Sequence, residues 1–236
     1  MKKSLSVVLA SLAIAAIADP SYSPQIGVTA LSLTQKNNII PVQFTSLTNG
    51  NVTAAALVCT NNIPVNSHLY VYDANSGYSA WTLSASGWQA LDTASTADGI
   101  SAGTPADGQT LVAGTAIWLS FPAQQNATVG IYGKVTDSYS VEIAAGTKQS
   151  PKNYLLANPT DSAISLSTVL SGMTPKKGDT IRIIGDTDTY TYNETATKWY
   201  KISPGESPAE ANLPSLAAFT GFWYMSKGGT GTITLH

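Results

Sequence analysis

The sequence predicts an all-β protein made of two related sandwich-like units, with at most one short helix. The second half repeats a phrase of the first: residues 111–118 (LVAGTAIW) and 216–223 (LAAFTGFW) carry Leu, Ala, Thr and Trp at the same offsets. In each half an aromatic hairpin candidate precedes the phrase and a Thr-rich segment follows it. Short apolar–polar alternations separated by Gly, Asn and Asp are typical of antiparallel strands. We therefore expect a first unit at 19–147 and a second at 148–236.

Alternating apolar residues predict the strands of the first half, at 29–33, 39–44, 69–72, 78–83, 88–91, 111–121, 128–135 and 141–143. Residues 49–51 (NGN) predict a tight turn, because Asn and Gly tolerate a positive φ. The segment 73–77 is rich in Asp, Asn and Gly, so the strands on its two sides are expected to form a hairpin. Residues 92–110 have few apolar side chains and predict a long surface loop.

The second half follows a junction at 146–153 and is the shorter of the two. Leu166, Val169 and Leu170 have helical spacing and Gly172 follows them, which predicts one short helix. Alternation predicts strands at 180–184, 189–192, 199–202, 219–225 and 230–235, with a turn at 185–188. A loop rich in Pro and Ala at 203–215 takes the place that the 92–110 loop has in the first half.

One succession of motifs runs through the second half: Asn158 and Pro159, then GDTIRI at 178–183, TYTY at 189–192, Trp199 and FTGFW at 219–223. This succession resembles a module of uncharacterised secreted β-repeat proteins, rich in Trp and Tyr, from environmental and gut bacteria. The resemblance is good over 154–235 and weak over 26–135, where Gly-Thr-Ala replaces the aromatic-Thr-Gly step before the Trp. It implies secretion and a β fold, and it implies nothing about chemistry.

The N-terminus predicts export from a bacterial cell. Lys2 and Lys3 precede an apolar run at 5–18 that closes with Ala-Ile-Ala, as in a signal peptide cleaved after Ala18. This run is shorter than the about 20 residues that a membrane-spanning helix needs, and polar residues interrupt every later apolar segment. The mature chain is therefore expected without a transmembrane segment, in the periplasm, on the outer surface or outside the cell.

Composition narrows the classes of partner and cofactor. Charged residues are 11% of the chain, against about 25% in an ordinary soluble protein, and the only basic cluster is Lys176 with Lys177. A nucleic-acid partner is therefore not expected. The single Cys59 lies in a strand-like run and is interpreted as a small buried hydrophobe, with a reactive thiol or an intermolecular disulfide as the alternative.

Patterns that would indicate an enzyme or a metal site are weak. Residues 99–103 spell G-x-S-x-G, but no strand or helix is predicted beside them and the only later His is His236. Zinc needs three or four ligands, and the chain has two dispersed His and one Cys. No catalytic residue, cofactor or metal is therefore predicted. Asp73 with Asn75, and Asp186 with Asp188, are weak calcium candidates in segments that also fit ordinary turns.

Aromatic side chains are the strongest binding candidates. Strand alternation places Tyr70 and Tyr72 on one face of their strand and Tyr190 and Tyr192 on one face of theirs. With Tyr78, Trp81 and Tyr200 they would form aromatic strips that stack on sugar rings, framed by the loops at 92–110 and 203–215. The alternative is cross-strand packing without a ligand. Trp118 and Trp223 have apolar neighbours and are both expected in the core.

These patterns together favour a non-enzymatic structural or adhesive protein of the cell surface. Its expected partners are copies of itself, other surface components or polysaccharide. The alternative hypothesis is a carbohydrate-binding module that uses the tyrosine and tryptophan strips.

Overall fold

The computed structural model describes residues 26–34, 36–47, 52–53, 63–91, 110–136 and 138–236. Within these ranges the structure consists of antiparallel strands and one short helix, α2 (Leu166–Val169), so the all-β prediction and the predicted helix are confirmed. No helix in the described part of the chain is long and apolar enough to cross a membrane. The predicted signal peptide, Cys59, the G-x-S-x-G match and nearly all of the 92–110 loop lie outside the described residues.

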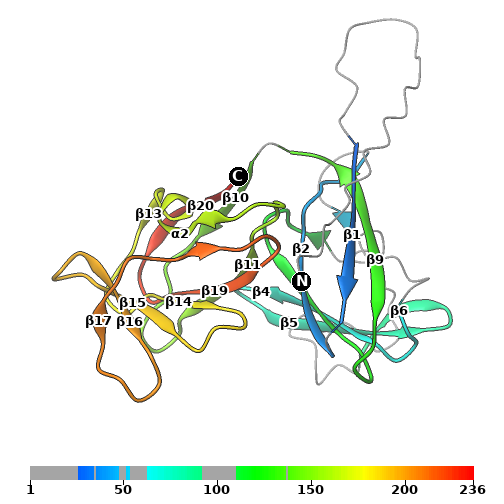
Figure 1. Cartoon of the computed structure of the whole chain (residues 1–236), viewed down its shortest axis with the longest axis horizontal. Coiled ribbons are helices and arrows are strands. Elements are labelled where there is room, and N and C mark those ends of the chain that lie inside the picture. The colour runs from blue at the N-terminus through cyan, green and yellow to red at the C-terminus, as the bar shows by residue number, and fades with distance from the viewer. Residues whose placement is uncertain (1–25, 35, 48–51, 54–62, 92–109, 137) are drawn as a thin grey trace, which may run out of the picture.

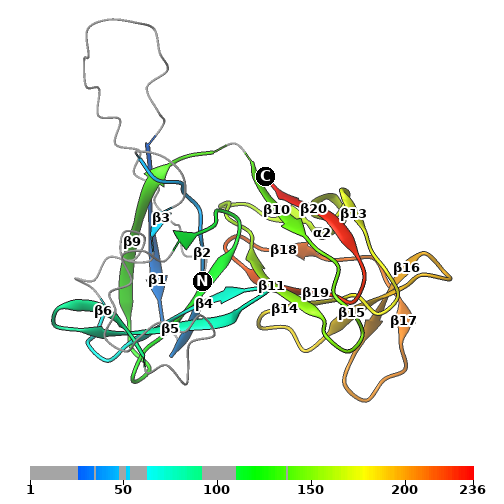
Figure 2. The same cartoon turned by 180° about the vertical axis from the view of Figure 1, so that it is seen from behind.

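The first half is built on a five-stranded sheet, seen on the right of Figure 1 and on the left of Figure 2. Its strand order is β2 (Asn37–Pro41), β8 (Ala116–Ser120), β4 (His68–Asp73), β5 (Gly77–Ser84) and β6 (Gly87–Ala90). Two strand pairs complete this half: β1 (Ile26–Leu33) with β9 (Ala127–Lys134), and β3 (Val52–Thr53) with β7 (Thr110–Leu111). The predicted hairpin is confirmed as β4 and β5.

The second half is built on a six-stranded sheet. Its order is β11 (Lys152–Ala157), β19 (Gly221–Ser226), β14 (Thr180–Ile183), β15 (Thr189–Asn193), β16 (Lys198–Ile202) and β17 (Ala209–Glu210). Beside it lie a three-stranded sheet of β10 (Tyr139–Ile143), β20 (Thr230–Leu235) and β13 (Met173–Thr174), and the pair of β12 (Ile164–Ser165) and β18 (Ser215–Leu216).

Strands pair in the same order in the two halves. The order β2-β8-β4-β5-β6 has its counterpart in β11-β19-β14-β15-β16, the pair β1-β9 in β10-β20, and the pair β3-β7 in β12-β18. The second half adds β13, β17 and α2. β10, which the sequence analysis places in the first unit, pairs along its length (Tyr139–Ile143) with β20, the last strand of the chain.

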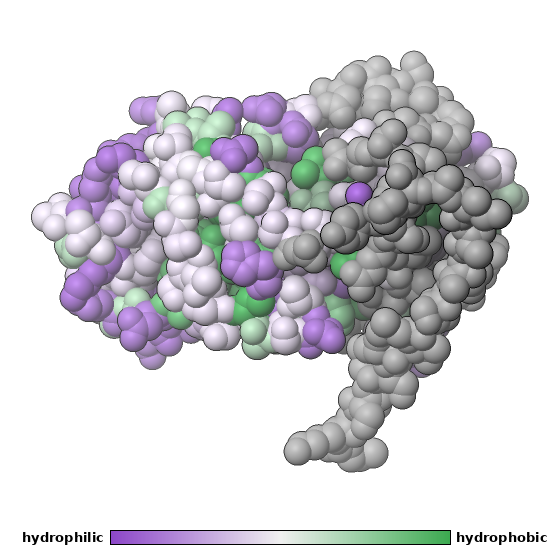
Figure 3. All heavy atoms as spheres, turned by 90° about the horizontal axis from the view of Figure 1, so that it is seen from above, coloured by the Kyte–Doolittle hydropathy of each residue, from purple (hydrophilic) through white to green (hydrophobic). Residues whose placement is uncertain are grey.

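Each half encloses its own apolar core, formed by the inward-facing alternate residues of its strands. The first core contains Leu69 and Ile117, both 0% exposed, and the second contains Ile181 and Phe222, also 0% exposed. Charged residues are only 11% of the chain, and the face drawn in Figure 3 shows mostly residues of intermediate hydropathy between scattered hydrophilic and hydrophobic ones on the second half. Two separate cores make the junction between the halves a distinct region of the fold.

A buried carboxylate joins three segments of the second half. Asp179 is 0% exposed, and its Oδ1 accepts the backbone N–H groups of Lys227 (2.7 Å) and Gly229 (3.4 Å). Its Oδ2 accepts the backbone N–H of Lys176 (2.9 Å) and the hydroxyl of Tyr224 (2.9 Å). Four donors compensate the carboxylate for the loss of water. Burial, together with the negative charge of Asp179, raises the pKa of the Tyr224 hydroxyl far above its ordinary value.

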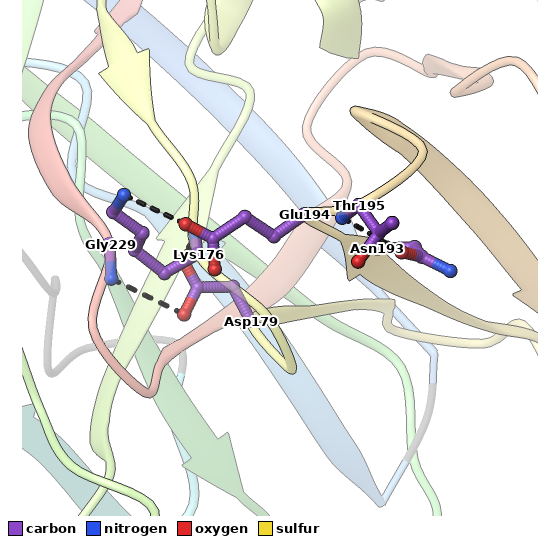
Figure 4. Close-up of polar contacts among 6 residues, drawn as sticks. All are labelled: Lys176, Asp179, Asn193, Glu194, Thr195 and Gly229. Carbon is purple, nitrogen blue, oxygen red and sulfur yellow. Dashed lines mark hydrogen bonds and ion pairs between the residues drawn. The ribbon is translucent and has the colours of Figure 1, made fainter.

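An exposed ion pair lies beside this carboxylate. The Nζ of Lys176 is 2.9 Å from Glu194 Oε1, and Figure 4 shows the contact next to Asp179. It connects the turn before β14 to the turn between β15 and β16, which is itself closed by Asn193 Oδ1 accepting the N–H of Thr195 at 3.1 Å. Solvent screens an exposed pair of this kind, so it adds little to stability and the buried carboxylate is the more important of the two contacts.

Candidate functional site

The repeated phrase forms the same turn in both halves. The backbone N–H of Thr115 donates to the carbonyl three residues earlier at 3.1 Å, and that of Thr220 does so at 3.2 Å. The carbonyl of Thr115 accepts the N–H of Val42, just after β2, at 2.9 Å, and the carbonyl of Thr220 accepts the N–H of Asn158, just after β11, at 3.0 Å. Three residues after each Thr comes a half-buried Trp, Trp118 on β8 and Trp223 on β19. The turn therefore places both Trp side chains at equivalent points of the two large sheets.

The residue before each Thr has a left-handed backbone. It is Gly114 (φ 88°) in the first half and Phe219 (φ 55°) in the second. A side chain other than Gly pays about 1–2 kcal/mol for this conformation. Phe219 packs against the core of the first half, which offsets that cost. Both turns therefore lie where the halves meet.

The halves meet through a small apolar cluster. It contains Ala116, Leu155 and Ala157, which are buried, and Ile39, Tyr72, Ile184 and Trp223, which pack against them. Close approach is possible because Gly221 has no side chain: a Cβ there would lie 2.6 Å from Ile39 Cγ2. An isolated β-bridge between Thr115 and Leu156 adds backbone contact between the halves.

Aromatic rings cover the outer face of β4, β5 and β8 beside this junction. Tyr72 lies edge-to-face against Tyr78 (centroids 4.8 Å apart) and against Trp223 of the second half (4.9 Å). Tyr70 lies 6.2 Å from Trp118, its cross-strand neighbour. Burial, and then the neighbouring Tyr72, raise the pKa of the Tyr78 hydroxyl, so Tyr78 is a neutral hydrogen-bonding group at ordinary pH. Tyr70, Tyr72, Tyr78, Trp118 and Trp223 are called the aromatic cluster below.

A pocket of about 220 Å³ opens at the edge of the aromatic cluster. The first half lines it with Asn37, Ile39 and Trp118, and the second half with Trp223 and residues 182–186, which are the end of β14 and the turn after it. This volume is below the about 300–1,000 Å³ of pockets that enclose drug-sized ligands. The pocket therefore suits one small ring, or one unit of a longer chain, held between groups from both halves. It is called the junction pocket below.

A second hollow of about 380 Å³ lies where the β4–β5 turn meets β10 and β11. Its charged lining groups include Asp73, Glu142 and Lys152. Asp73 accepts hydrogen bonds within its own turn, and Glu142 Oε1 accepts the hydroxyl of Thr232 at 2.6 Å. Both acids thus serve the fold, and no tryptophan lines this hollow, so the junction pocket is the better candidate site.

Three of the predicted aromatic residues come together in the structure. Tyr70 and Tyr72 are half-buried on the outer face of β4, and Tyr78 is 37% exposed opposite them on β5. Trp81, predicted beside them, is 1% exposed in the first core. That prediction is wrong, because Trp81 pairs with Leu69 and shares its inward face.

The predicted tyrosines of the second half form no strip with those of the first. Tyr190 is 5% exposed and belongs to the second core, which corrects its prediction as a ligand-binding residue. Tyr192 shares that inward-facing side and packs against Trp199, with centroids 5.3 Å apart. Tyr200 is half-buried on the opposite face, in register with Thr191. None of the three lines the junction pocket.

Sequence reasoning missed the residues that line the junction pocket. Trp118 and Trp223 were expected in the core, and both are half-buried on outer faces. The signal was present in the strand alternation: Ile117 and Leu119 are each 0% exposed, so the residue between them points outward. The side chain of Arg182 projects outward from β14 in the same way, between two buried Ile residues.

The calcium candidates serve turns. Asp73 Oδ1 accepts the backbone N–H groups of Asn75 and Ser76, each at 2.9 Å. Burial acts to raise the pKa of Asp73, but these hydrogen bonds outweigh it and the pKa lies below its ordinary value. Asp186 Oδ1 accepts the N–H of Asp188 at 3.1 Å, and Asp188 forms an ion pair with Lys201 at 3.2 Å. Within the described ranges no three His, Cys, Asp or Glu side chains gather as metal ligands would.

No protein-family model, curated protein or solved structure matches this chain. The resemblance to secreted bacterial β-repeat proteins therefore stays a prediction.

Proposed function

We propose that this protein is an exported, non-enzymatic adhesive protein of a bacterial surface, built from two related units, that binds carbohydrate in the junction pocket. One observation carries the proposal. Trp118 and Trp223 hold the same position in the repeated phrase, one in each half, and both line the same pocket. The shared order of strand pairing in the two halves supports the two-unit part of the proposal.

The chemistry of the lining fits a sugar ring. Aromatic faces carry partial negative charge and attract the weakly positive C–H groups of a pyranose ring. Asn37, Arg182 and Asp186 supply polar groups at the same pocket, as ligand sites with a mainly apolar lining commonly do. A pocket of about 220 Å³ holds one sugar unit while the exposed Tyr78 extends the aromatic surface beyond it.

The competing interpretation is that the aromatic cluster only holds the halves together. Trp223 belongs to the junction cluster and contacts Tyr72, so its loss would affect packing and binding alike. Trp118 is different, because it lines the pocket but belongs to neither core nor to the junction cluster. Trp118 therefore separates binding from packing.

The test is a glycan array with the mature protein, followed by titration of tryptophan fluorescence with each glycan that binds. The substitution Trp118→Ala should weaken binding about 5- to 150-fold, since the stacking of a flat ring on one aromatic side chain is worth about 1–3 kcal/mol. Tyr132→Ala is the matched control, because Tyr132 is a 50% exposed aromatic residue on β9, outside the pocket. No binding across the array, or equal binding by Trp118→Ala and wild type, would refute the proposal.

The adhesive role has its own test. Cells that express the protein should retain it on their surface, and added glycan that binds the pocket should release cells from a glycan-coated plate. Retention of Trp118→Ala on the cell together with loss of plate binding would support adhesion through the pocket. Release of the protein into the medium without any surface retention would contradict it.

A further inference from the structure

Arg182 is the only arginine in the 236-residue sequence, and it lies at the junction pocket. It is exposed on the outer face of β14, directly opposite Trp223 on β19. The equivalent cross-strand pair in the first half is Tyr70 with Trp118. The second half thus has a permanent positive charge where the first half has a phenol.

Among the described residues, none forms a hydrogen bond or an ion pair with the guanidinium group of Arg182. The described residues form three ion pairs, and all three use lysine: Lys176 with Glu194, Lys198 with Glu210, and Lys201 with Asp188. Asp186 also lines the pocket, but it forms no ion pair with Arg182, and its Oδ1 accepts the N–H of Asp188. Five N–H donors in a planar fork are therefore available to a ligand.

One further lining residue also offers a donor. Asn37 uses its side-chain oxygen to accept the hydroxyl of Ser120 at 2.8 Å, which leaves its NH₂ group for a ligand. The pocket is thus rich in donors, with Asp186 as its one acidic side chain.

We propose that the junction pocket binds a carboxylated sugar, a uronate unit of an acidic polysaccharide, with the carboxylate on Arg182. This inference rests on the proposed function. A planar guanidinium donates two parallel hydrogen bonds to a planar carboxylate, a geometry that a tetrahedral sulfate ester matches less well. The ring stacks on tryptophan, and the remaining oxygen of Asp186 accepts a sugar hydroxyl.

The experiment compares three ligands by isothermal titration: oligogalacturonate, the neutral galacto-oligosaccharide of the same length, and a sulfated galacto-oligosaccharide. Wild type should bind the oligogalacturonate most tightly. Arg182→Gln should weaken that binding about 10- to 100-fold, the usual effect of losing hydrogen bonds to a charged group, and should weaken the binding of the neutral ligand much less. The affinity of Arg182→Lys for oligogalacturonate should lie between those of wild type and Arg182→Gln, because lysine keeps the positive charge but cannot donate two parallel hydrogen bonds.

Lys148→Gln is the matched control, because Lys148 is an exposed cation that does not line the pocket. Equal losses from Lys148→Gln and Arg182→Gln would overturn the proposal in favour of unspecific attraction. Equal binding of the uronate and neutral ligands by wild type, or tighter binding of the sulfated one, would also overturn it while leaving the carbohydrate site intact. Binding of none of the three, with no hit on the glycan array, would refute the proposed function itself.

Discussion

Replacing the buried carboxylate Asp179 by its amide isostere tests how the second half is held together. In Asp179→Asn the side-chain oxygen still accepts the N–H groups of Lys227 and Gly229, which bind Oδ1 at 2.7 and 3.4 Å. The new NH₂ group replaces Oδ2 and faces the backbone N–H of Lys176, which donated to that oxygen at 2.9 Å. Two donors then point at each other in a site that water does not reach.

The cost follows from these contacts. Hydrogen bonds to a charged group contribute about 1.5–3 kcal/mol each, and a buried donor left without an acceptor costs about 1–3 kcal/mol. Of the two bonds to Oδ2, the one from Lys176 is lost, whereas the hydroxyl of Tyr224 can rotate and accept from the new NH₂ group. The free energy of unfolding should therefore fall by about 2–4 kcal/mol.

Urea unfolding followed by fluorescence and circular dichroism measures this change. Asp161→Asn is the control, since Asp161 is exposed, and it should change the unfolding free energy by less than about 0.5 kcal/mol. Tyr224→Phe removes one bond to the same oxygen, and the double substitution should cost less than the sum of the two single ones because the residues share a network. An Asp179→Asn protein as stable as Asp161→Asn would refute the reasoning.

Three further predictions concern stability. Because the pKa of the Tyr224 hydroxyl is raised in the folded state, its contribution to the free energy of unfolding is complete below about pH 10 and declines above it, by up to about 1.4 kcal/mol per pH unit. Tyr224→Phe should therefore flatten the fall of the urea midpoint between about pH 9 and 11.5, and a parallel fall in both proteins would contradict this. Gly114→Ala should lower the free energy of unfolding by about 2–4 kcal/mol, because the new Cβ would lie 2.9 Å from Tyr139 Cβ on the facing strand β10. Gly185→Ala is the control: Gly185 has a similar φ of 91° but no atom within 4 Å of the new Cβ, so the loss should be only about 1–2 kcal/mol. Equal losses in the two variants would show that packing at the junction is unimportant. Trp81→Ala, which truncates a core residue, should lower the free energy of unfolding by about 3–5 kcal/mol, and Trp118→Ala should lower it by less than about 2 kcal/mol. The reverse order of stability in thermal unfolding would contradict the placement of Trp81 in the core and of Trp118 on an outer face.

Local structure was predictable wherever one sheet face is buried. The alternation of Leu69 and Val71 with tyrosines identified a strand, and the Asp–Asn–Gly turn after it identified the hairpin. The short strands β3, β12 and β18 were missed, because a two-residue strand has no period to detect. The partner of β10 was also beyond reach, since Val141 and Ile143 predict a strand without saying which strand it joins.

The candidate site was predictable only in part. Tyr70, Tyr72 and Tyr78 lie within one hairpin, so local alternation and one turn bring them together. Trp223 reaches the same cluster from the other half of the chain, and Arg182 reaches the pocket because β14 pairs with β19. Trp81 was assigned to the wrong face although the alternation within β5 sets it opposite to Tyr78 and on the same face as the buried Leu83, so this signal was present in the sequence and was missed.

The sequence by itself determined the fold class, the positions of most main strands, with β11 as the exception, and the repeated phrase that ends in Trp118 and Trp223. These features depend on side-chain periodicity and turn residues within about ten positions, which a linear reading captures. Only the tertiary structure decided that the two tryptophans share a pocket with Arg182. That outcome depends on contacts between residues about 40 to 145 positions apart, and such contacts are set by how two apolar surfaces pack and not by the order of residues along either strand.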